Sequence, residues 1–176
     1  NNLLYLFFFF ELVVWTSLFL IPMGKSKKAA SVYYGFSAAG SFALLFAVLL
    51  IFTNTGSFNI AGIASMTGGY KLTVFFLLMV AAFAKLGAYP FFVWLPKVLG
   101  NAPDPVSAVF SGGIEKLGAF IAVLALLKIT PAAATFNAVG LPWQDYIIGA
   151  IAAVTIIAGT MMAIRQDDAK KLLAYS

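Results

Sequence analysis

The feature that most constrains this chain is a series of long apolar runs separated by short polar or charged breaks. Each run reaches about 20 residues, the length that an α-helix needs to cross the hydrocarbon core of a bilayer. The five runs are 3–21, 29–53, 72–98, 106–129 and 146–164. Only 10% of the residues are charged, whereas a soluble domain carries roughly 25%. We therefore predict an integral membrane protein of the all-α class, a polytopic transmembrane helix bundle that forms one domain over 1–176.

Two missing residue types remove whole classes of site. The chain contains no cysteine and no histidine, which excludes disulfides, thiolate-held clusters, haem and the usual zinc sites. Its basic residues are scattered between apolar runs instead of forming a basic face, which excludes nucleic-acid binding. We expect neither a catalytic site nor a cofactor in this chain.

The basic loop residues indicate how the helices are oriented. If the first run crosses from outside to inside, seven basic loop residues fall inside and two fall outside. Those inside are Lys25, Lys27, Lys28, Lys97, Arg165, Lys170 and Lys171, and those outside are Lys71 and Lys128. Because positively charged loops stay in the cytoplasm, we place the loop from Lys25 to Lys28 there. The chain starts just before one apolar run and ends as another begins, which indicates a fragment of a longer protein.

Four charged side chains lie deep inside the apolar runs: Glu11, Lys85, Glu115 and Lys116. Lys85 lies about 20 Å along its run and Lys116 about 15 Å, which places both near the membrane midplane. A charge there costs at least about 2.5 kcal/mol, and such residues usually face the bundle interior and mark an ion path. The alternative for Glu11 and Lys85 is a static ion pair that fixes helix register. For Glu115 it is a polar pocket or a contact with a partner subunit.

Pro90 predicts a break in the third run. It cannot donate to the carbonyl of Leu86 and its ring clashes with that carbonyl, so we expect the helix to break about one turn after Lys85. Irregular backbone at membrane depth occurs where protein or a water-filled cavity covers it, and broken helices are frequent in ion transporters. Lys85 and Gly87 beside the break favour a transport role.

Other residues predict packing and boundaries. Asp104 is expected to cap the fourth helix, ahead of a proline at the first helical position. Gly112, Gly113 and Gly118 are expected to let a neighbouring helix approach closely. Trp94 lies near a segment end, which is typical of an aromatic at the membrane interface.

Residues 85–120, KLGAYPFFVWLPKVLGNAPDPVSAVFSGGIEKLGAF, resemble the signature of the antiporter-like subunit family. The family comprises chains L, M and N of the proton-pumping NADH:quinone oxidoreductase (complex I), the large subunits of Mrp-type sodium/proton antiporters, and membrane subunits of energy-converting hydrogenases. The residues in register are Lys85, Pro90, Phe91, Trp94, Leu95, Pro96, Ala102, Pro103, Pro105, Val106, Ser107, Ala108, Lys116 and Gly118. A second stretch resembles the family's cytoplasmic motif through Gln166, Asp168, Lys170, Ala174, Tyr175 and Ser176.

The resemblance implies a fold and a role for three of the four deep charges. The five runs would be helices five to nine of a fourteen-helix subunit built from two inverted five-helix repeats. Glu11 would be the family's membrane glutamate, paired with Lys85, and Lys116 would relay protons toward a central hydrophilic axis. Where the family often has histidine and aspartate, this chain has Phe92 and Lys97, so the family's route through that histidine is missing.

We therefore predict a proton-translocating, antiporter-like subunit of a redox-driven membrane complex, either complex I or a related energy-converting hydrogenase. Flavin, iron–sulfur or quinone cofactors are expected only in partner subunits. The other partners would be further membrane subunits, the lipid bilayer and H+. The complex would lie in a bacterial or archaeal cell membrane, or in the membrane of an energy-transducing organelle.

Two alternatives stay open. A Mrp-type Na+/H+ antiporter subunit predicts sodium-dependent transport. A structural membrane subunit without ion flux predicts that a charge swap between Glu11 and Lys85 preserves both assembly and coupling to turnover.

Overall fold

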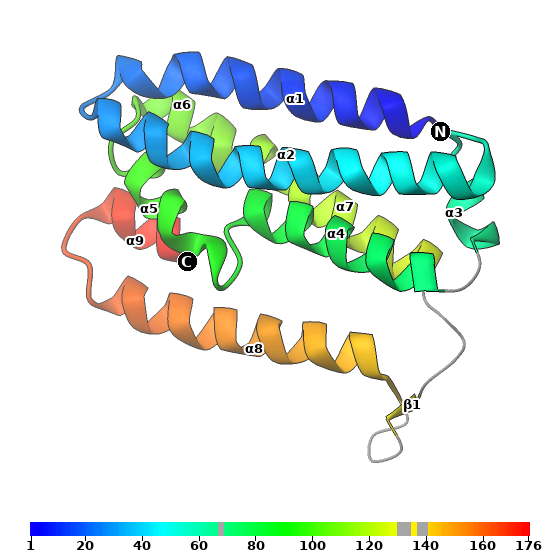
Figure 1. Cartoon of the computed structure of the whole chain (residues 1–176). Coiled ribbons are helices and arrows are strands. Elements are labelled where there is room, and N and C mark those ends of the chain that lie inside the picture. Colours follow the sequence, from blue (N-terminus) through cyan, green and yellow to red (C-terminus); the bar gives the residue numbers. More distant parts are fainter. Residues whose placement is uncertain (67–68, 130–134, 137–140) are drawn as a thin grey trace.

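The computed structural model describes residues 1–66, 69–129, 135–136 and 141–176 and is helical almost throughout (Figure 1). The helices are α1 (Leu3–Leu20), η1 (Ile21–Met23), α2 (Lys27–Thr55), α3 (Gly62–Ser65), α4 (Gly69–Leu86), η2 (Phe91–Val93), α5 (Trp94–Leu99), α6 (Asp104–Val109), η3 (Phe110–Ile114), α7 (Lys116–Ile129), α8 (Trp143–Ile164) and α9 (Ala169–Tyr175). The strands β1 (Thr135–Phe136) and β2 (Leu141–Pro142) form a short antiparallel pair.

Five helical segments in the described part of the chain are long and apolar enough to cross a membrane. They are Leu3–Met23, Lys27–Thr55, Gly69–Leu99, Asp104–Ile129 and Tyr146–Ile164. These segments coincide with the five predicted runs, so the prediction of an all-α transmembrane bundle is confirmed. The third span is broken after α4, as predicted from Pro90. The fourth span is also interrupted, by the π-helical turn η3, which we did not predict.

Helix α4 lies at the centre of the bundle, between α2 and α7, and α1 packs on the far side of α2 (Figure 1). Apolar side chains from these four helices form one core, among them Phe10, Leu44, Leu78 and Ile121. Lipid is as apolar as these side chains, so close packing rather than water exclusion holds such helices together.

Two glycines let the helices approach α4 closely. A Cβ added at Gly40 of α2 would lie 3.1 Å from the Ala84 Cβ, and one added at Gly118 of α7 would lie 2.6 Å from the carbonyl oxygen of Ala82. The predicted packing role of Gly118 is therefore confirmed. Gly112 and Gly113 were predicted to act in the same way, but an added Cβ would meet nothing within 4 Å at either. Within the described residues that prediction is wrong for these two glycines, because both lie in η3 and are exposed, with no helix packed against them.

The loops that carry most of the basic residues lie at one end of the bundle. The turn between α1 and α2 packs against the turn between α5 and α6, where the Lys25 amide donates to the Asn101 carbonyl at 2.8 Å. Helix α9 packs against α5 at the same end, whereas α3 lies at the other end (Figure 1). The fold therefore brings the basic loop residues, from which the cytoplasmic side was predicted, to one end of the bundle.

Candidate functional site

Lys85, near the end of α4, is buried inside the bundle. Its side chain is 1% exposed, and its Nζ donates a hydrogen bond to the hydroxyl of Tyr33 on α2 at 2.8 Å. The same ammonium lies 5.1 Å from the ring centroid of Phe10 on α1 and 5.1 Å from that of Tyr33. Aromatic ring faces attract a cation, and more strongly where water is excluded. Side chains from α1 and α2 thus build a cage that keeps the ammonium of the lysine away from water.

Tyr33 was not among the predicted site residues. Its ring is fully buried and lies edge-on to Trp94 and Phe110, at centroid distances of 5.3 and 5.5 Å. These contacts fix the phenol, so its hydroxyl is positioned to meet Lys85. A signal was present in the sequence, because Tyr33, Ser37 and Ser41 recur every four residues in an apolar helix and all three are buried. Such spacing places polar groups on one helix face.

Glu11 of α1 lies beside this cage without touching the lysine. No ion pair joins Glu11 to Lys85, but the carboxylate is near enough to act electrostatically on both Lys85 and Tyr33. Its Oε1 is buried and has no hydrogen-bond partner. The structure therefore brings the two predicted residues into one neighbourhood, with the Tyr33 phenol as the group that contacts the lysine.

The break after Lys85 is formed at Gly87 and stabilised by a hydrogen bond from the indole of Trp94. Helix α4 ends at Leu86, and Gly87 adopts a φ of 67°, a left-handed conformation that favours glycine. The Trp94 Nε1 donates to the carbonyl of Ala84 at 2.9 Å, which satisfies a backbone acceptor near the helix end. Trp94 is fully buried. It therefore packs inside the bundle and is not the lipid-facing interfacial aromatic that we predicted.

Glu115 and Lys116 follow the π-helical turn in the fourth span. Glu115 is 9% exposed, and its Oε1 is buried without a hydrogen-bond partner. Lys116, the first residue of α7, is exposed in this chain. π-Helical turns occur frequently at functional sites. The interruption leaves one carboxylate buried beside an accessible ammonium.

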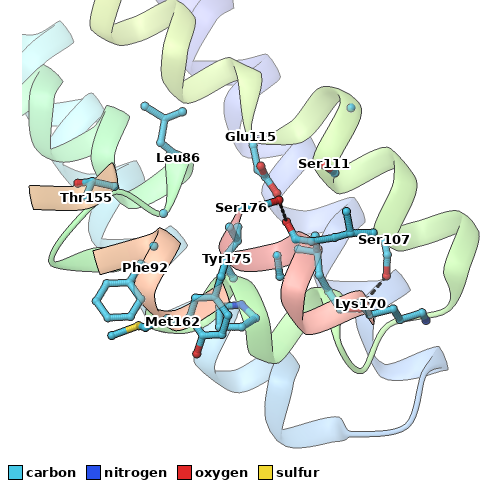
Figure 2. A pocket seen from close by; sticks show the side chains of 18 of the residues that line it. Leu86, Phe92, Ser107, Ser111, Glu115, Thr155, Met162, Lys170, Tyr175 and Ser176 are labelled. Carbon is cyan, nitrogen blue, oxygen red and sulfur yellow. Dashed lines mark hydrogen bonds between the residues drawn. The ribbon is translucent and has the colours of Figure 1, made fainter. Parts of the chain in front are cut away.

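A cavity of about 820 Å³ connects these two residues with the break. It is lined by the end of α4, by α5, α6 and η3, and by α8 and α9. Figure 2 shows the Glu115 side chain pointing into this cavity, with Ser107, Ser111 and Thr155 on its walls. Phe92 lies on the wall as well. The cavity is therefore largely apolar, with a few hydroxyls and the charged side chains of Asp104, Glu115, Lys116 and Lys170.

The predicted cytoplasmic motif closes one end of this cavity. Asp168 caps α9 by accepting a hydrogen bond from the backbone amide of Lys170 at 2.9 Å. Lys170 forms an ion pair with Asp104 and donates to the Ala102 carbonyl at 3.2 Å. Gln166 donates to the carbonyl of Met162 at 3.2 Å. The motif thus ties α9 to the start of α6.

This ion pair corrects one prediction. Asp104 was expected to cap the fourth helix, but it is the first residue of α6, and Pro103 occupies the cap position. The Asp104 carboxylate binds Lys170 instead of the backbone amides because α9 brings a cation to it.

No group of three or more carboxylates that could hold a metal ion comes together in the part of the chain that the structure describes. The chemistry that these residues can perform is the binding and transfer of protons or the binding of a single cation. Amines, carboxylates, a phenol and hydroxyls are the groups present.

The sequence is similar throughout to proteins of one kind. The family described as "NADH:quinone oxidoreductase/Mrp antiporter, TM" matches residues 1–176. Subunit N of the NADH-quinone oxidoreductase of Trichlorobacter lovleyi is 35% identical over 159 residues, which cover 86% of this chain and 31% of the relative. Component B of hydrogenase-4 from Escherichia coli strain K12 is 31% identical over 182 residues, which cover 100% of this chain and 26% of the relative.

The fold is similar to that of a solved respiratory complex. A chain of the membrane-bound sulfane sulfur reductase, an archaeal respiratory membrane complex, matches with a TM-score of 0.84 and 27% identity, over 99% of this chain and 30% of that chain. This chain thus spans less than a third of the length of these relatives. Because the family model matches all of residues 1–176, the chain belongs to the NADH:quinone oxidoreductase/Mrp antiporter transmembrane family.

Proposed function

We propose that this chain is part of a proton-translocating, antiporter-like membrane subunit of a redox-driven complex. The observation that carries the proposal is the Lys85 ammonium, buried beside a broken helix and held by two aromatic side chains, Tyr33 through its hydroxyl and Phe10 through its ring. Ionisable residues buried inside transmembrane bundles usually mark proton or ion paths. The similar proteins from an NADH-quinone oxidoreductase and a hydrogenase support a redox-driven host complex.

In this proposal Lys85 changes its protonation state as its surroundings change. When the Glu11 carboxylate approaches, the charged lysine is stabilised, and when it withdraws, the proton is released. The Tyr33 hydroxyl accepts a hydrogen bond from the ammonium, so it keeps Nζ in place during this exchange. The Oε1 of Glu11 has no hydrogen-bond partner, so no hydrogen bond at this atom opposes such a movement.

Lys116 and Glu115 form the next station of the path in this proposal. Both line the cavity beside the helix break. A proton that leaves Lys85 would reach this polar end of the cavity through water, and Lys116 would pass it onward. Moving each charge against the membrane potential costs about 2.3 kcal/mol per 100 mV. The driving force must therefore come from outside these helices.

The proposal extends to the surroundings of the chain. The loop from Lys25 to Lys28 faces the cytoplasm, in a bacterial or archaeal cell membrane or the membrane of an energy-transducing organelle. Other membrane subunits of the complex are the partners, and flavin, iron–sulfur or quinone groups lie in partner subunits. Residues 1–176 act as one transmembrane domain.

A second candidate is Na+/H+ exchange of the Mrp type. It is favoured by the buried carboxylate oxygens of Glu11 and Glu115 that have no hydrogen-bond partner, because carboxylate oxygens bind hard cations. Transport that requires sodium and saturates with it would support this candidate. Proton transport that is unchanged when potassium replaces sodium would exclude it.

The deciding experiment is proton pumping by the complete complex in sealed vesicles, carrying Lys85→Met. Pumping is normalised to the amount of subunit and to the rate of the driving reaction. The matched control is Lys128→Met, which removes an exposed lysine from the far end of α7. We expect Lys85→Met to abolish pumping in an assembled complex and the control to retain it. Unchanged pumping in Lys85→Met would contradict the proposal and favour a structural subunit.

A further inference from the structure

A second, smaller groove lies at the end of the bundle that carries the basic loops. It has a volume of about 310 Å³ and is formed by η2, α5, the turn after α8, and α9. Lys97 and Lys171 line it together with the amides of Asn101 and Gln166, and Phe92 and Val93 supply an apolar wall. The groove thus has a cationic, amide-rich part and an apolar part.

The two lysines of this groove are not neutralised by the protein. Within the described residues, no ion pair engages Lys97 or Lys171. The nearby carboxylate of Asp104 is already paired with Lys170, and Asp168 is occupied as the cap of α9. Both lysines are exposed. Two unpaired cations on one groove favour an anionic ligand.

The backbone around the groove is shaped to hold these lysines. The stem of Lys171 lies against Gly100, where an added Cβ would be 3.2 Å from the lysine Cγ and 3.6 Å from its Cε. The Asn101 Nδ2 donates to the carbonyl of Lys97 at 2.7 Å, which secures the end of α5. Lysine stems that pack on the protein while the ammonium stays free are suited to contacts at a membrane surface.

The position of the groove along the bundle indicates which kind of anion it binds. It lies where the apolar spans end, between the third span and α9, which is the depth of lipid headgroups. Val93 is 38% exposed beside it and can contact an acyl chain. Basic pockets between transmembrane helices on the cytoplasmic side bind anionic headgroups.

We infer that this groove binds the phosphate of an anionic phospholipid, with Lys97 and Lys171 on either side of the phosphodiester. The amide groups of Asn101 and Gln166 serve as further polar contacts to the headgroup, and the acyl chains run along Phe92 and Val93. This site depends on the membrane placement of the chain and not on proton transport.

The test uses the complete complex, stripped of lipid in detergent and titrated with phosphatidylglycerol or phosphatidylcholine. Bound lipid is counted by native mass spectrometry. The variant is Lys97→Gln with Lys171→Gln, and the matched control is Lys71→Gln with Lys128→Gln, which removes the same charge at the other end of the bundle. Each of the two lysines strengthens the binding of an anionic headgroup by a comparable amount. Removing both charges should therefore weaken phosphatidylglycerol binding about tenfold to thirtyfold. The control should bind as the unmodified complex does.

Several outcomes would overturn the inference. Equal phosphatidylglycerol binding by the groove variant and its control would show that these lysines do not hold lipid. Equal binding of phosphatidylcholine would show that the headgroup charge is not recognised. Displacement of the lipid by millimolar inorganic phosphate would assign the groove to a free anion. Proton pumping is not read out here, so a failure of this inference is distinguishable from a failure of the proposed function.

Discussion

Two lysines that lie deep in apolar runs have opposite surroundings in the folded chain. Lys85 is 1% exposed, and its ammonium lies against two aromatic side chains, Tyr33 and Phe10. Lys116 is exposed in this chain and lines a cavity of about 820 Å³. Both lie beside an interruption of a transmembrane helix, α4 at Gly87 in one case and η3 in the other. These two lysines show that the depth of a residue along a transmembrane helix does not decide whether its charge is buried or accessible to water.

The difference follows from the position of the two helices in the bundle. Helix α4 is covered by α2 and α7, so Lys85 near its end is enclosed. The η3 turn that precedes Lys116 lines the cavity through Ser111 and Gly112. In the proposed path, the protonation of the enclosed Lys85 is controlled by its surroundings, and the accessible Lys116 exchanges protons with water.

The largest expected effect comes from separating α7 from α4. In Gly118→Leu, the new side chain meets the Ala82 carbonyl oxygen, 2.6 Å from an added Cβ, and the Leu86 amide at 2.8 Å. Overpacking of this kind costs about 1 to 3 kcal/mol or more, so we expect loss of the assembled subunit from the complex. The amount of subunit in the purified complex measures it.

Gly113→Leu is the matched control, because an added Cβ there meets nothing within 4 Å. We expect it to assemble. Equal loss in both variants would mean that the contact between α7 and α4 does not depend on Gly118.

The next effect tests the cage around Lys85. Tyr33→Phe keeps the ring against Trp94 and Phe110 but removes the acceptor of the 2.8 Å hydrogen bond from Lys85. A hydrogen bond to a charged group contributes about 1.5 to 3 kcal/mol, so we expect proton pumping to fall at least about tenfold in an assembled complex. Initial pumping rates in sealed vesicles measure it.

Tyr34→Phe provides the comparison for this variant. Tyr34 is 42% exposed and lies against Trp15 instead of the lysine cage. Its pumping rate should match that of the unmodified complex. A Tyr33→Phe complex that pumps as fast as the Tyr34→Phe complex would rule out a positioning role for the Tyr33 hydroxyl.

A smaller effect compares the two lysines directly. A water-soluble amine reagent should modify Lys116 at a rate close to that of the exposed Lys128, because the reagent reaches the cavity. Lys85 should stay unmodified in the folded complex, since its ammonium is enclosed. Peptide mass spectrometry after timed labelling measures all three sites. Labelling of Lys85 at the rate of Lys128 would remove the contrast between the two lysines.

The smallest effect concerns the ion pair at the end of the cavity. Asp104 is 83% exposed and Lys170 is 33% exposed, and ion pairs so open to water contribute little to stability. We expect Asp104→Asn to leave both the thermal stability of the complex and the labelling of Lys116 nearly unchanged. Lys170 keeps its hydrogen bond to the Ala102 carbonyl.

Packing of α9, not its ion pair, should hold this end of the cavity. A Cβ added at Gly159 of α8 would lie 2.9 Å from the Tyr175 carbonyl oxygen. Gly159→Val should therefore displace α9 and raise the labelling of Lys116 above that seen in Asp104→Asn. Equal labelling in the two variants would contradict this order.

Much of the fold was predictable because hydrophobic length is a local property. The apolar runs and the positions of Lys85, Pro90 and Lys116 follow directly from the order of residues. The family signature from residues 85–120 was also visible, since it depends on identity and spacing. The η3 turn was not predictable, because α-helical and π-helical turns use the same apolar residues and the choice depends on packing against neighbouring helices.

The features of the candidate site also fall into those that the sequence predicts and those that depend on the tertiary structure. The sequence by itself determined that this chain spans a membrane and carries four charges where lipid would otherwise be, because both facts follow from composition along the chain. Only the tertiary structure decided that Tyr33 contacts Lys85, that Glu11 lies near Lys85 without forming an ion pair, and that Trp94 is buried. Side-chain partners come from different helices, and which faces of those helices meet is fixed by close packing at residues such as Gly118.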